Sequence, residues 1–258
     1  MQFSKDSEIT LVVTSCGRFD LLERTLHSFD RFNSAPIREV LITEDSGDEA
    51  VRSCVPAHWL AHTRFFVNVP KLGQLASIDL AYSSVATPYI FHCEDDWEFY
   101  RPGFVENSLA ILMADPEVLQ VWLRSYAHDL RVHSPYLRPG ERRLINGVSC
   151  YPVISDKPDW QGFSLNPGLR RLVDYRRCAP FAAWGGEKAL SKNYAELGLH
   201  AVMLEGDAVL HTGFDAHVTL PVERLRKQRR KKREQLKIGA AVTCGVVTGA
   251  VLGRLFLF

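Results

Sequence analysis

The sequence contains no Cys-x-x-Cys pair, no N-terminal apolar stretch of the kind found in signal peptides, and no internal repeat. The first absence argues against a zinc or redox site built on such a pair, and the third excludes a repeat architecture. Without an apolar leader, secretion through a signal peptide is not indicated. We therefore interpret the six scattered cysteines as reduced thiols in a cytosolic protein.

Disorder is not indicated either, because hydrophobic residues make up 46% of the 258 residues. A chain of this length and composition can bury enough apolar surface for one large domain or two small ones. Apart from one basic run near the C-terminus, no segment has low complexity. The sequence therefore predicts a globular body.

Charge is distributed unevenly, although the formal net charge is only +1. The segment 224–237 holds nine Lys or Arg residues against one acid, Glu234, a local net charge of +8. Residues 1–223 are correspondingly acidic, so an acidic body is joined to a basic stalk. Such a stalk could bind nucleic acid, but the apolar segment after it favours a membrane surface, and we predict no nucleic-acid partner.

The apolar segment, residues 238–258, follows the body (1–223) and the stalk (224–237) and contains one charge, Arg254, near its end. At about 1.5 Å per residue, a helix of this length approaches the roughly 30 Å hydrocarbon thickness of a bilayer. We predict a C-terminal hydrophobic, membrane-associated helix, with the stalk on anionic lipids and the body in the cytoplasm. A re-entrant or surface-lying helix, and a buried soluble helix, remain as alternatives. Small residues recur every four positions and would allow helix–helix self-association: Ala241, Gly245, Gly249 and Gly253.

Within the body, apolar strand-like runs alternate with helical patterns. Residues 9–14 form a nearly continuous β-branched run, as expected of a strand buried on both faces. Alternation of this kind predicts an α/β fold with a mostly parallel central sheet flanked by helices. The predicted strands are residues 9–14, 39–43, 64–69, 89–93, 118–123, 149–154 and 200–204, and the predicted helices are residues 20–32, 72–86 and 186–197.

Three of the predicted strands end in polar clusters, at residues 14–18, 44–46 and 94–96. In open parallel sheets, ligands bind beyond the carboxyl ends of the strands, so these clusters should converge on one edge. The third cluster is an acidic triplet, whose ionised carboxylates repel one another unless a cation is present. Hard oxygen ligands suit Mn²⁺ or Mg²⁺, which commonly bridge carboxylates to substrate phosphates. A metal site with a nucleotide-like ligand is therefore predicted, with a solvated acidic turn as the alternative.

Several motifs between residues 9 and 213 occur in a recognisable order. They are the strand, polar loop and Leu-rich helix of residues 11–29, the acidic turn 44–48, the glycine-containing loop 71–74, the triplet 94–96, the stretch 163–169, the sequence Trp-Gly-Gly-Glu at 184–187, and His211. In this order they resemble family 2 glycosyltransferases of the GT-A fold, in which the triplet position holds an Asp-x-Asp metal motif. Each motif alone is weak, and the shared order makes the resemblance stronger.

The resemblance implies a role for each of these positions. Asp96 would bind Mn²⁺ or Mg²⁺ directly, His211 would complete the metal site, and Glu187 would be the catalytic base. Asp45 would accept hydrogen bonds from the nucleobase. The other residues implied in nucleotide-sugar binding are Thr14, Ser15, Arg18, Gly73, Gln74, Glu94 and Asp95.

Two positions depart from the family pattern. Glu94 stands in place of the first Asp of the metal motif and is expected to face the ribose or a metal-bound water. Lys188 follows Glu187 where the family often has Asp, so Asp156 and Asp159 are reserve candidates for the base. These departures leave the metal position at Asp96 intact.

Ordinary structural roles are also open to several of these residues. Glu187 could serve only to cap or charge the first turn of its helix. His211 could be a core histidine, and Gly73 could simply end a turn. Trp97 and Trp160 are expected to pack in the interior rather than stack on sugars. Only the tertiary arrangement separates these roles from functional ones.

The resemblance implies a metal-dependent, inverting glycosyltransferase that moves a sugar from a nucleotide-sugar donor to a saccharide or lipid-linked acceptor at the cytosolic membrane face, as in polysaccharide biosynthesis. A sugar-phosphate nucleotidyltransferase is one alternative, but those enzymes resemble one another in a Gly-rich N-terminal loop, and residues 14–18 contain one Gly. A non-catalytic membrane adaptor with the same fold is another, and the intact acidic triplet argues against it.

Overall fold

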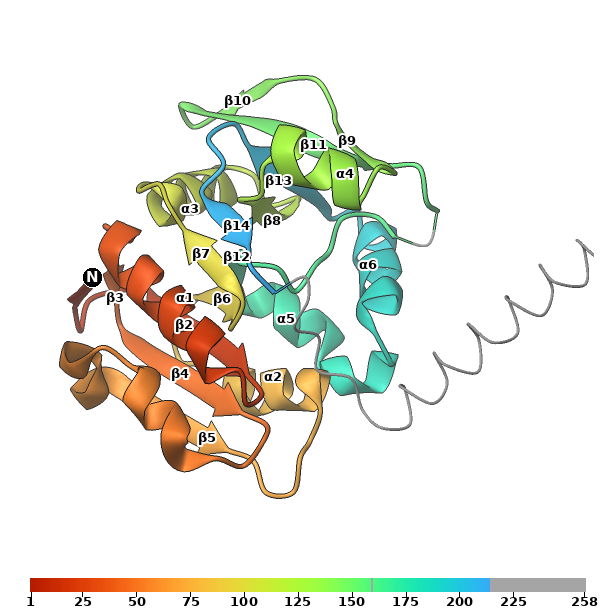
Figure 1. The fold of residues 1–258 in the computed structure, drawn as a ribbon. Helices are drawn as coiled ribbons and strands as arrows, with labels where there is room; N and C mark the ends of the chain where they lie inside the picture. The colour runs from red at the N-terminus through yellow and green to blue at the C-terminus, as the bar shows by residue number, and fades with distance from the viewer. Residues whose placement is uncertain (159, 214–258) are drawn as a thin grey trace, which may run out of the picture. The chain divides into compact units, whose positions relative to one another are not determined.

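The central sheet has five strands in the computed structural model, which describes residues 1–158 and 160–213. Strands β2, β4, β5 and β6 are parallel, and β12 lies antiparallel to β6 at one edge (Figure 1). The strand order is β12 (Gly168–Arg171), β6 (Tyr89–Glu94), β2 (Ile9–Ser15), β4 (Glu39–Glu44) and β5 (Thr63–Val67). The predicted mostly parallel sheet is confirmed.

Helices α1 (Phe19–Phe32) and α2 (Gln74–Ser83) connect these strands, and α2 is shorter than the predicted helix 72–86. Gly73 has φ +90°, which no α-helix contains, so the helix begins only after it. Strand β5 also ends early, at Val67 instead of residue 69.

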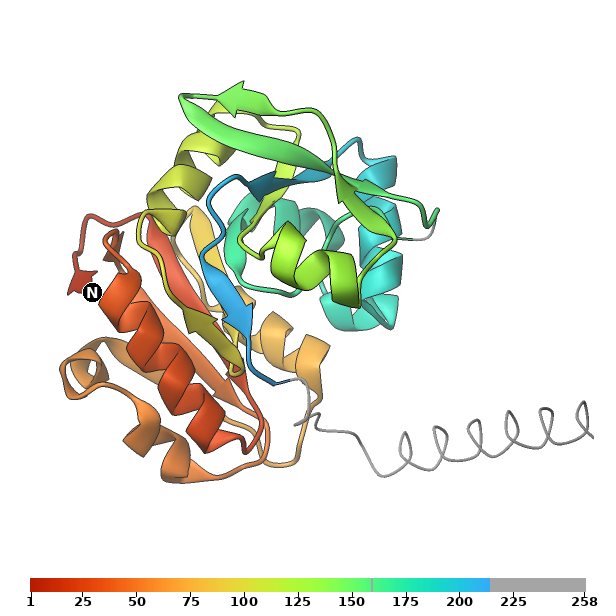
Figure 2. The same ribbon diagram turned by 45° about the horizontal axis from the view of Figure 1, so that its top comes forward.

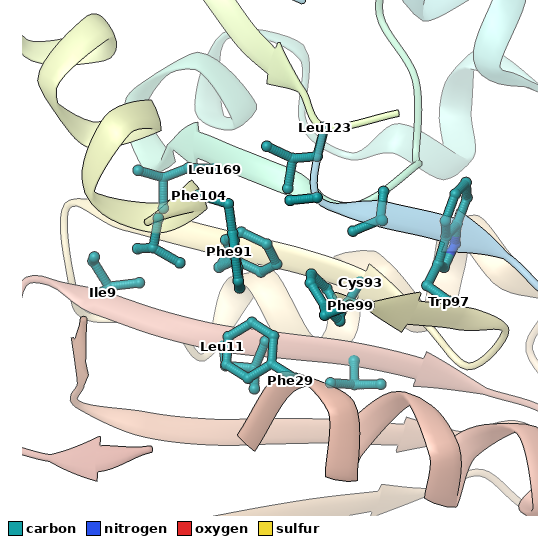
Figure 3. Close-up of a cluster of buried hydrophobic side chains, with 14 of the residues drawn as sticks. Ile9, Leu11, Phe29, Phe91, Cys93, Trp97, Phe99, Phe104, Leu123 and Leu169 are labelled. Carbon is teal, nitrogen blue, oxygen red and sulfur yellow. The ribbon is translucent and has the colours of Figure 1, made fainter. Parts of the chain in front are cut away.

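The two helices cover opposite faces of the sheet. Alternate residues of a strand point to opposite faces, and Leu11 and Val13 pack in the same cluster as α1, while Val12 packs with α2. Figure 3 shows the side chain of Phe29, on α1, directed toward the buried aromatic side chains beside the sheet. The ring centroids of Phe29 and Phe91 lie 5.2 Å apart. Burial on both faces explains why β2 is apolar without alternation.

A second sheet contains the strands predicted downstream, and the sequence did not indicate that they pair with one another. Its order is β10, β11, β13 and β8, with β9 also on β11, and it lies above the central sheet in Figures 1 and 2. The bounds are β8 (Val118–Trp122), β9 (Leu137–Pro139), β10 (Arg143–Ile145), β11 (Val148–Ser155) and β13 (His200–Leu204). Helix α6 (Glu187–Glu196) agrees with the predicted helix 186–197.

Strand β12 and helix α3 (Phe104–Ala114) were not predicted from the sequence. A small antiparallel pair, β7 (Trp97–Phe99) with β14 (Val209–His211), brings the end of the described chain beside the acidic triplet. The remaining elements are β1 (Gln2–Phe3), β3 (Pro36–Ile37), η1 (Glu49–Cys54), η2 (Ala57–His62), η3 (Tyr126–Leu130), α4 (Arg131–His133), α5 (Leu172–Cys178) and η4 (Phe181–Trp184).

Within residues 1–158 and 160–213, no helix is both long enough and apolar enough to cross a membrane. The predicted stalk, the predicted membrane-associated helix and its small residues all lie outside the described residues. The five cysteines of the described part are free thiols, as predicted: Cys16, Cys54, Cys93, Cys150 and Cys178.

Candidate active site

The polar ends of β2, β4 and β6 lie at one edge of the central sheet. Thr14 is paired in register with Glu94, and Ser15 with Glu44. The predicted convergence of the three polar clusters is therefore confirmed. Ser15 Oγ is buried and has no hydrogen-bond partner in the described part of the chain, so this edge retains unused hydrogen-bonding capacity.

Arg18 binds the second and third acids of the triplet. Its Nη1 lies 2.8 Å from Asp96 Oδ2 and its Nε lies 3.2 Å from Asp95 Oδ2, while Nη2 pairs with Asp95 Oδ1. Burial raises the pKa of Asp95 to about 6, although Arg18 acts in the opposite direction. The guanidinium thus supplies the cation that a buried acidic cluster requires. The role of Arg18 in nucleotide-sugar binding stays a prediction.

Asp96 also meets His211, which comes from a distant part of the sequence. His211 Nε2 lies 3.3 Å from Asp96 Oδ2, and Thr212 donates its backbone N–H to Asp96 O at 2.8 Å. The His211 ring packs against Trp97, with centroids 4.8 Å apart. Burial would raise the pKa of Asp96, but hydrogen bonds and charge from His211 and Arg18 hold it below the ordinary value. Asp96 is therefore kept ionised, the state in which a carboxylate binds a metal.

The residues present fit a divalent cation shared with a substrate. Asp96 Oδ1 is buried and has no hydrogen-bond partner within residues 1–158 and 160–213, an arrangement that an added ligand would relieve. A carboxylate and an imidazole are suitable ligands for Mn²⁺. No group of three or more His, Cys, Asp or Glu in the described residues could hold a metal by itself. Asp96 and His211 would therefore share the ion with phosphate oxygens, as Mg²⁺ sites commonly do.

Gly213 lets the chain pass directly over Asp96. A Cβ atom at residue 213 would lie 2.3 Å from Asp96 Oδ2, far inside contact distance. We expect Gly213→Ala to displace the 211–213 segment, to lower the free energy of unfolding by about 1–3 kcal/mol and to weaken Mn²⁺ binding. Chemical denaturation and Mn²⁺ titration would measure the two effects.

Gly206→Ala is the matched control for this substitution. Its added Cβ would meet Arg101 Nη1 at 2.9 Å, at the tip of an exposed and flexible side chain that can move aside. Stability and Mn²⁺ binding should stay near the wild-type values. Equal behaviour of the two alanine variants would contradict the close approach at Gly213.

Glu94 lies on the inner side of this edge. Its Oε1 accepts a hydrogen bond from Gln74 Nε2 at 2.7 Å, which joins the triplet to the start of α2. Burial and the carboxylates of Asp96, Glu187 and Asp95 raise its pKa to about 8. Glu94 is therefore protonated over much of the neutral range, which suits a hydrogen bond to a hydroxyl better than direct metal binding. Its predicted role toward the ribose stays a prediction.

Asp45 organises the loop before α2. Its Oδ2 accepts from the Gly73 N–H at 2.8 Å, and its Oδ1 accepts from Leu72 N at 2.8 Å, Asn68 Nδ2 at 3.0 Å and Ser77 Oγ at 3.2 Å. These bonds place Gly73 at the sheet edge and explain the late start of the helix. The contact predicted with a nucleobase stays a prediction, and it would use the second lone pair of Oδ2.

Glu187 is the first residue of α6 and accepts two hydrogen bonds from one segment. Leu165 N donates to Oε2 at 3.2 Å, and Trp160 Nε1 donates to Oε1 at 3.4 Å. Burial raises its pKa above the ordinary value. Its charge also raises the pKa of Glu94, so the candidate base lies near the acidic triplet. An oriented carboxylate with a raised pKa is suited to accept a proton.

The other candidates for the base lie in less suitable places. Asp156 is 64% exposed and lies 3.8 Å from Arg138, and Asp159 lies outside the described residues. Lys188 follows Glu187 on α6 and makes a contact of its own. Trp97 and Trp160 are buried, which confirms the prediction that they pack in the interior.

Glu44 lies in the predicted polar cluster 44–46 without a predicted role of its own, and Asn68 lies inside the predicted strand 64–69. Glu44 is fully buried, and its Oε1 accepts from Gly17 N at 3.0 Å and Ser46 N at 2.7 Å, so it ties two loops of the edge together. Asn68 supports Asp45. Asn68 directly follows β5 because that strand ends at Val67, so the correct strand end would have placed Asn68 at the same edge as Glu94.

Neither the known protein families nor the curated proteins include a match to this sequence. Solved structures do match. A mannosyltransferase from Pyrobaculum calidifontis, PcManGT, in complex with GDP-Man and Mn²⁺, is 15% identical with a TM-score of 0.59 over 81% of this chain and 58% of its own. S. aureus TarS 1–349 is 12% identical with a TM-score of 0.53, covering 80% and 61% of the two chains.

These similarities show the fold of this chain and leave its activity open. The described residues have a mixed α/β, GT-A-like glycosyltransferase fold, as the resemblance of the sequence motifs implied. The chain spans about three fifths of the length of either matched structure. What the matched proteins do as whole molecules therefore enters only as a proposal.

Proposed function

We propose that this protein is a metal-dependent glycosyltransferase that moves a sugar from a nucleotide-sugar donor to a saccharide or lipid-linked acceptor. The observation that carries the proposal is the meeting of Asp96 and His211, 3.3 Å apart, at the carboxyl edge of the sheet. The similar mannosyltransferase was solved with a nucleotide sugar and Mn²⁺. A fold of this kind with an oxygen and nitrogen ligand pair at that edge is suited to the same class of donor.

Each part of the edge has a task in this reaction. A divalent ion held by Asp96 and His211 would stabilise the charge that develops on the leaving diphosphate. Arg18, already in contact with both aspartates, is placed to pair with a phosphate as well, since a guanidinium has five N–H donors. Gly73 and Gln74 lie beside the triplet, where backbone can approach a ligand closely.

Glu187 is the residue we propose as the base toward the acceptor hydroxyl. Its two hydrogen bonds hold the carboxylate in one orientation, and the buried setting favours proton uptake. A base acting on a single displacement would invert the anomeric centre, and we propose that outcome. We place the protein in the family 2-like group on the order of its motifs, and assign it to polysaccharide biosynthesis on the same basis.

The direct test is a panel of nucleotide sugars incubated with the full chain and Mn²⁺. Release of nucleoside diphosphate and binding of the donor would be scored for each member. At least one donor should bind in a Mn²⁺-dependent manner and be turned over. Metal-independent binding of all donors, with no release of diphosphate, would overturn the proposal.

We also propose that residues 224–258 attach the protein to the cytosolic face of a membrane. The proposal rests on the basic and apolar composition of this segment. A variant that lacks 224–258 should lose cosedimentation with vesicles containing anionic lipid, and a variant with the nine basic residues replaced by Gln should bind neutral and anionic vesicles equally. A truncated form that still sediments with lipid would refute the attachment.

A further inference from the structure

Arg170 is a buried arginine that the proposed reaction has not yet used. It lies on β12, is 4% exposed, and forms no ion pair within residues 1–158 and 160–213. Its guanidinium packs over the Phe163 ring, 5.4 Å from the centroid. A buried charge without a carboxylate partner is costly, so a role that requires this charge is indicated.

The hydrogen bonds of Arg170 go to the segment that holds Glu187. Its Nη2 donates to the carbonyl oxygen of Ser164 at 2.7 Å and to that of Asn166 at 3.0 Å. Leu165, between these two residues, donates its N–H to Glu187 Oε2. The Ser164 carbonyl and the Leu165 N–H belong to one peptide group, so Arg170 holds the same peptide group that orients the candidate base, and it also holds the carbonyl of Asn166.

Gln120 holds the same segment without a charge. It is fully buried on β8, accepts from Ser164 N at 3.2 Å through Oε1, and donates through Nε2 to the carbonyl oxygen of Asn166 at 3.3 Å. Two side chains, Arg170 and Gln120, therefore fix the segment, and both donate to the carbonyl oxygen of Asn166. They differ in that only Arg170 carries a positive charge toward Glu187.

We propose that Arg170 is a positioning residue for the reaction: it orients the Glu187 carboxylate through the 164–166 segment, and its positive charge favours the ionised form of that carboxylate. The inference rests on the proposed function, since it assigns Glu187 to proton transfer. Two further titratable groups lie near or adjoin Glu187: Glu94 from β6, whose charge acts in the opposite sense when it ionises, and Lys188 on α6 itself. Among the groups on other elements, Arg170 is the cation that lowers the pKa of Glu187 against the effect of burial.

The test compares Arg170→Gln, Arg170→Lys and Gln120→Met over a range of pH, with the donor and Mn²⁺ established for the wild type. Without the charge, Glu187 needs a higher pH to ionise, so Arg170→Gln should lose kcat about tenfold or more at the acid end and recover toward the alkaline end. In Arg170→Lys, which keeps the charge, kcat should fall on the acid side at nearly the same pH as in the wild type. Gln120→Met should lower kcat equally at every pH.

The inference would be overturned if kcat of Arg170→Gln fell on the acid side at the same pH as in the wild type. It would also be overturned if Gln120→Met shifted that pH as much as Arg170→Gln does. If Arg170→Gln does not fold, Arg170→Met removes the same charge with an apolar side chain and repeats the comparison. Carboxyl ¹³C titration of Glu187, assigned with Glu187→Gln, gives the shift without turnover. A wild-type protein with no transfer activity would refute the proposed function, whereas an active wild type whose Glu187 titrates identically with and without the Arg170 charge would refute only this inference.

Discussion

Asp96→Asn is expected to abolish metal-dependent sugar transfer. Asp96 contacts both Arg18 and His211, and its Oδ1 is buried without a hydrogen-bond partner in the described part of the chain. An amide binds Mn²⁺ much more weakly than a carboxylate, and metal stabilisation of a leaving diphosphate supplies several kcal/mol. We expect a loss of about 10³-fold in kcat/KM, and an equally clear loss of Mn²⁺ binding in the presence of a nucleoside diphosphate.

Glu98→Gln is the matched control for this variant. Glu98 lies two residues further along the same turn and strand, is 43% exposed, and pairs only at the surface with Arg24. Neutralising it should change neither turnover nor metal binding, because exposed pairs of this kind contribute little. Full activity of Asp96→Asn, with the fold verified by thermal unfolding, would refute the metal assignment.

Glu187→Gln is expected to lower kcat by about 10²- to 10⁴-fold, the usual contribution of a positioned base. The amide can still accept a hydrogen bond from Leu165, so the fold and donor binding should be retained. Because the loss falls on proton transfer, KM for the donor should change little. Steady-state kinetics with varied donor, together with donor binding by calorimetry, separates the two effects.

The pH dependence gives a second readout on Glu187. A base works when ionised, and burial raises the pKa of Glu187, so wild-type kcat should rise with pH above the range of an ordinary glutamate. This limb should be absent in Glu187→Gln and unchanged in Glu196→Gln, which alters an exposed residue at the far end of α6. Retention of the limb in Glu187→Gln would place the base elsewhere.

The strands of the central sheet were predictable because their signal is local. Residues 9–14, 39–43 and 89–93 are nearly unbroken apolar runs, and the structure extends each by one residue. Burial between two layers of helix requires that composition at every position, whatever the rest of the chain does. The polar residues directly after these runs therefore marked the edge of the sheet.

Elements defined by distant partners were not predictable in this way. Strand β12 has four residues, two of them arginine, and it is a strand only because it pairs with β6 across about 78 positions of sequence. Helix α2 begins later than predicted because the N–H groups of Leu72 and Gly73 bind Asp45, which lies 27 and 28 positions away in the sequence. Contacts at such separations leave no periodic signature in a local window of sequence.

By itself, the sequence determined the α/β class, the sheet edge at which three polar clusters end, and the residues able to bind a metal or accept a proton there. Only the tertiary structure decided the partners of the acidic triplet. Asp95 and Asp96 pair with Arg18, Asp96 also pairs with His211, and Glu94 accepts a hydrogen bond from Gln74. It also decided that Glu187 is held by a segment clamped from β12. The apolar composition of a segment and the spacing of its apolar residues reflect which positions are buried, and both can be seen in the sequence. The charge state and orientation of a side chain depend instead on neighbours that folding brings together.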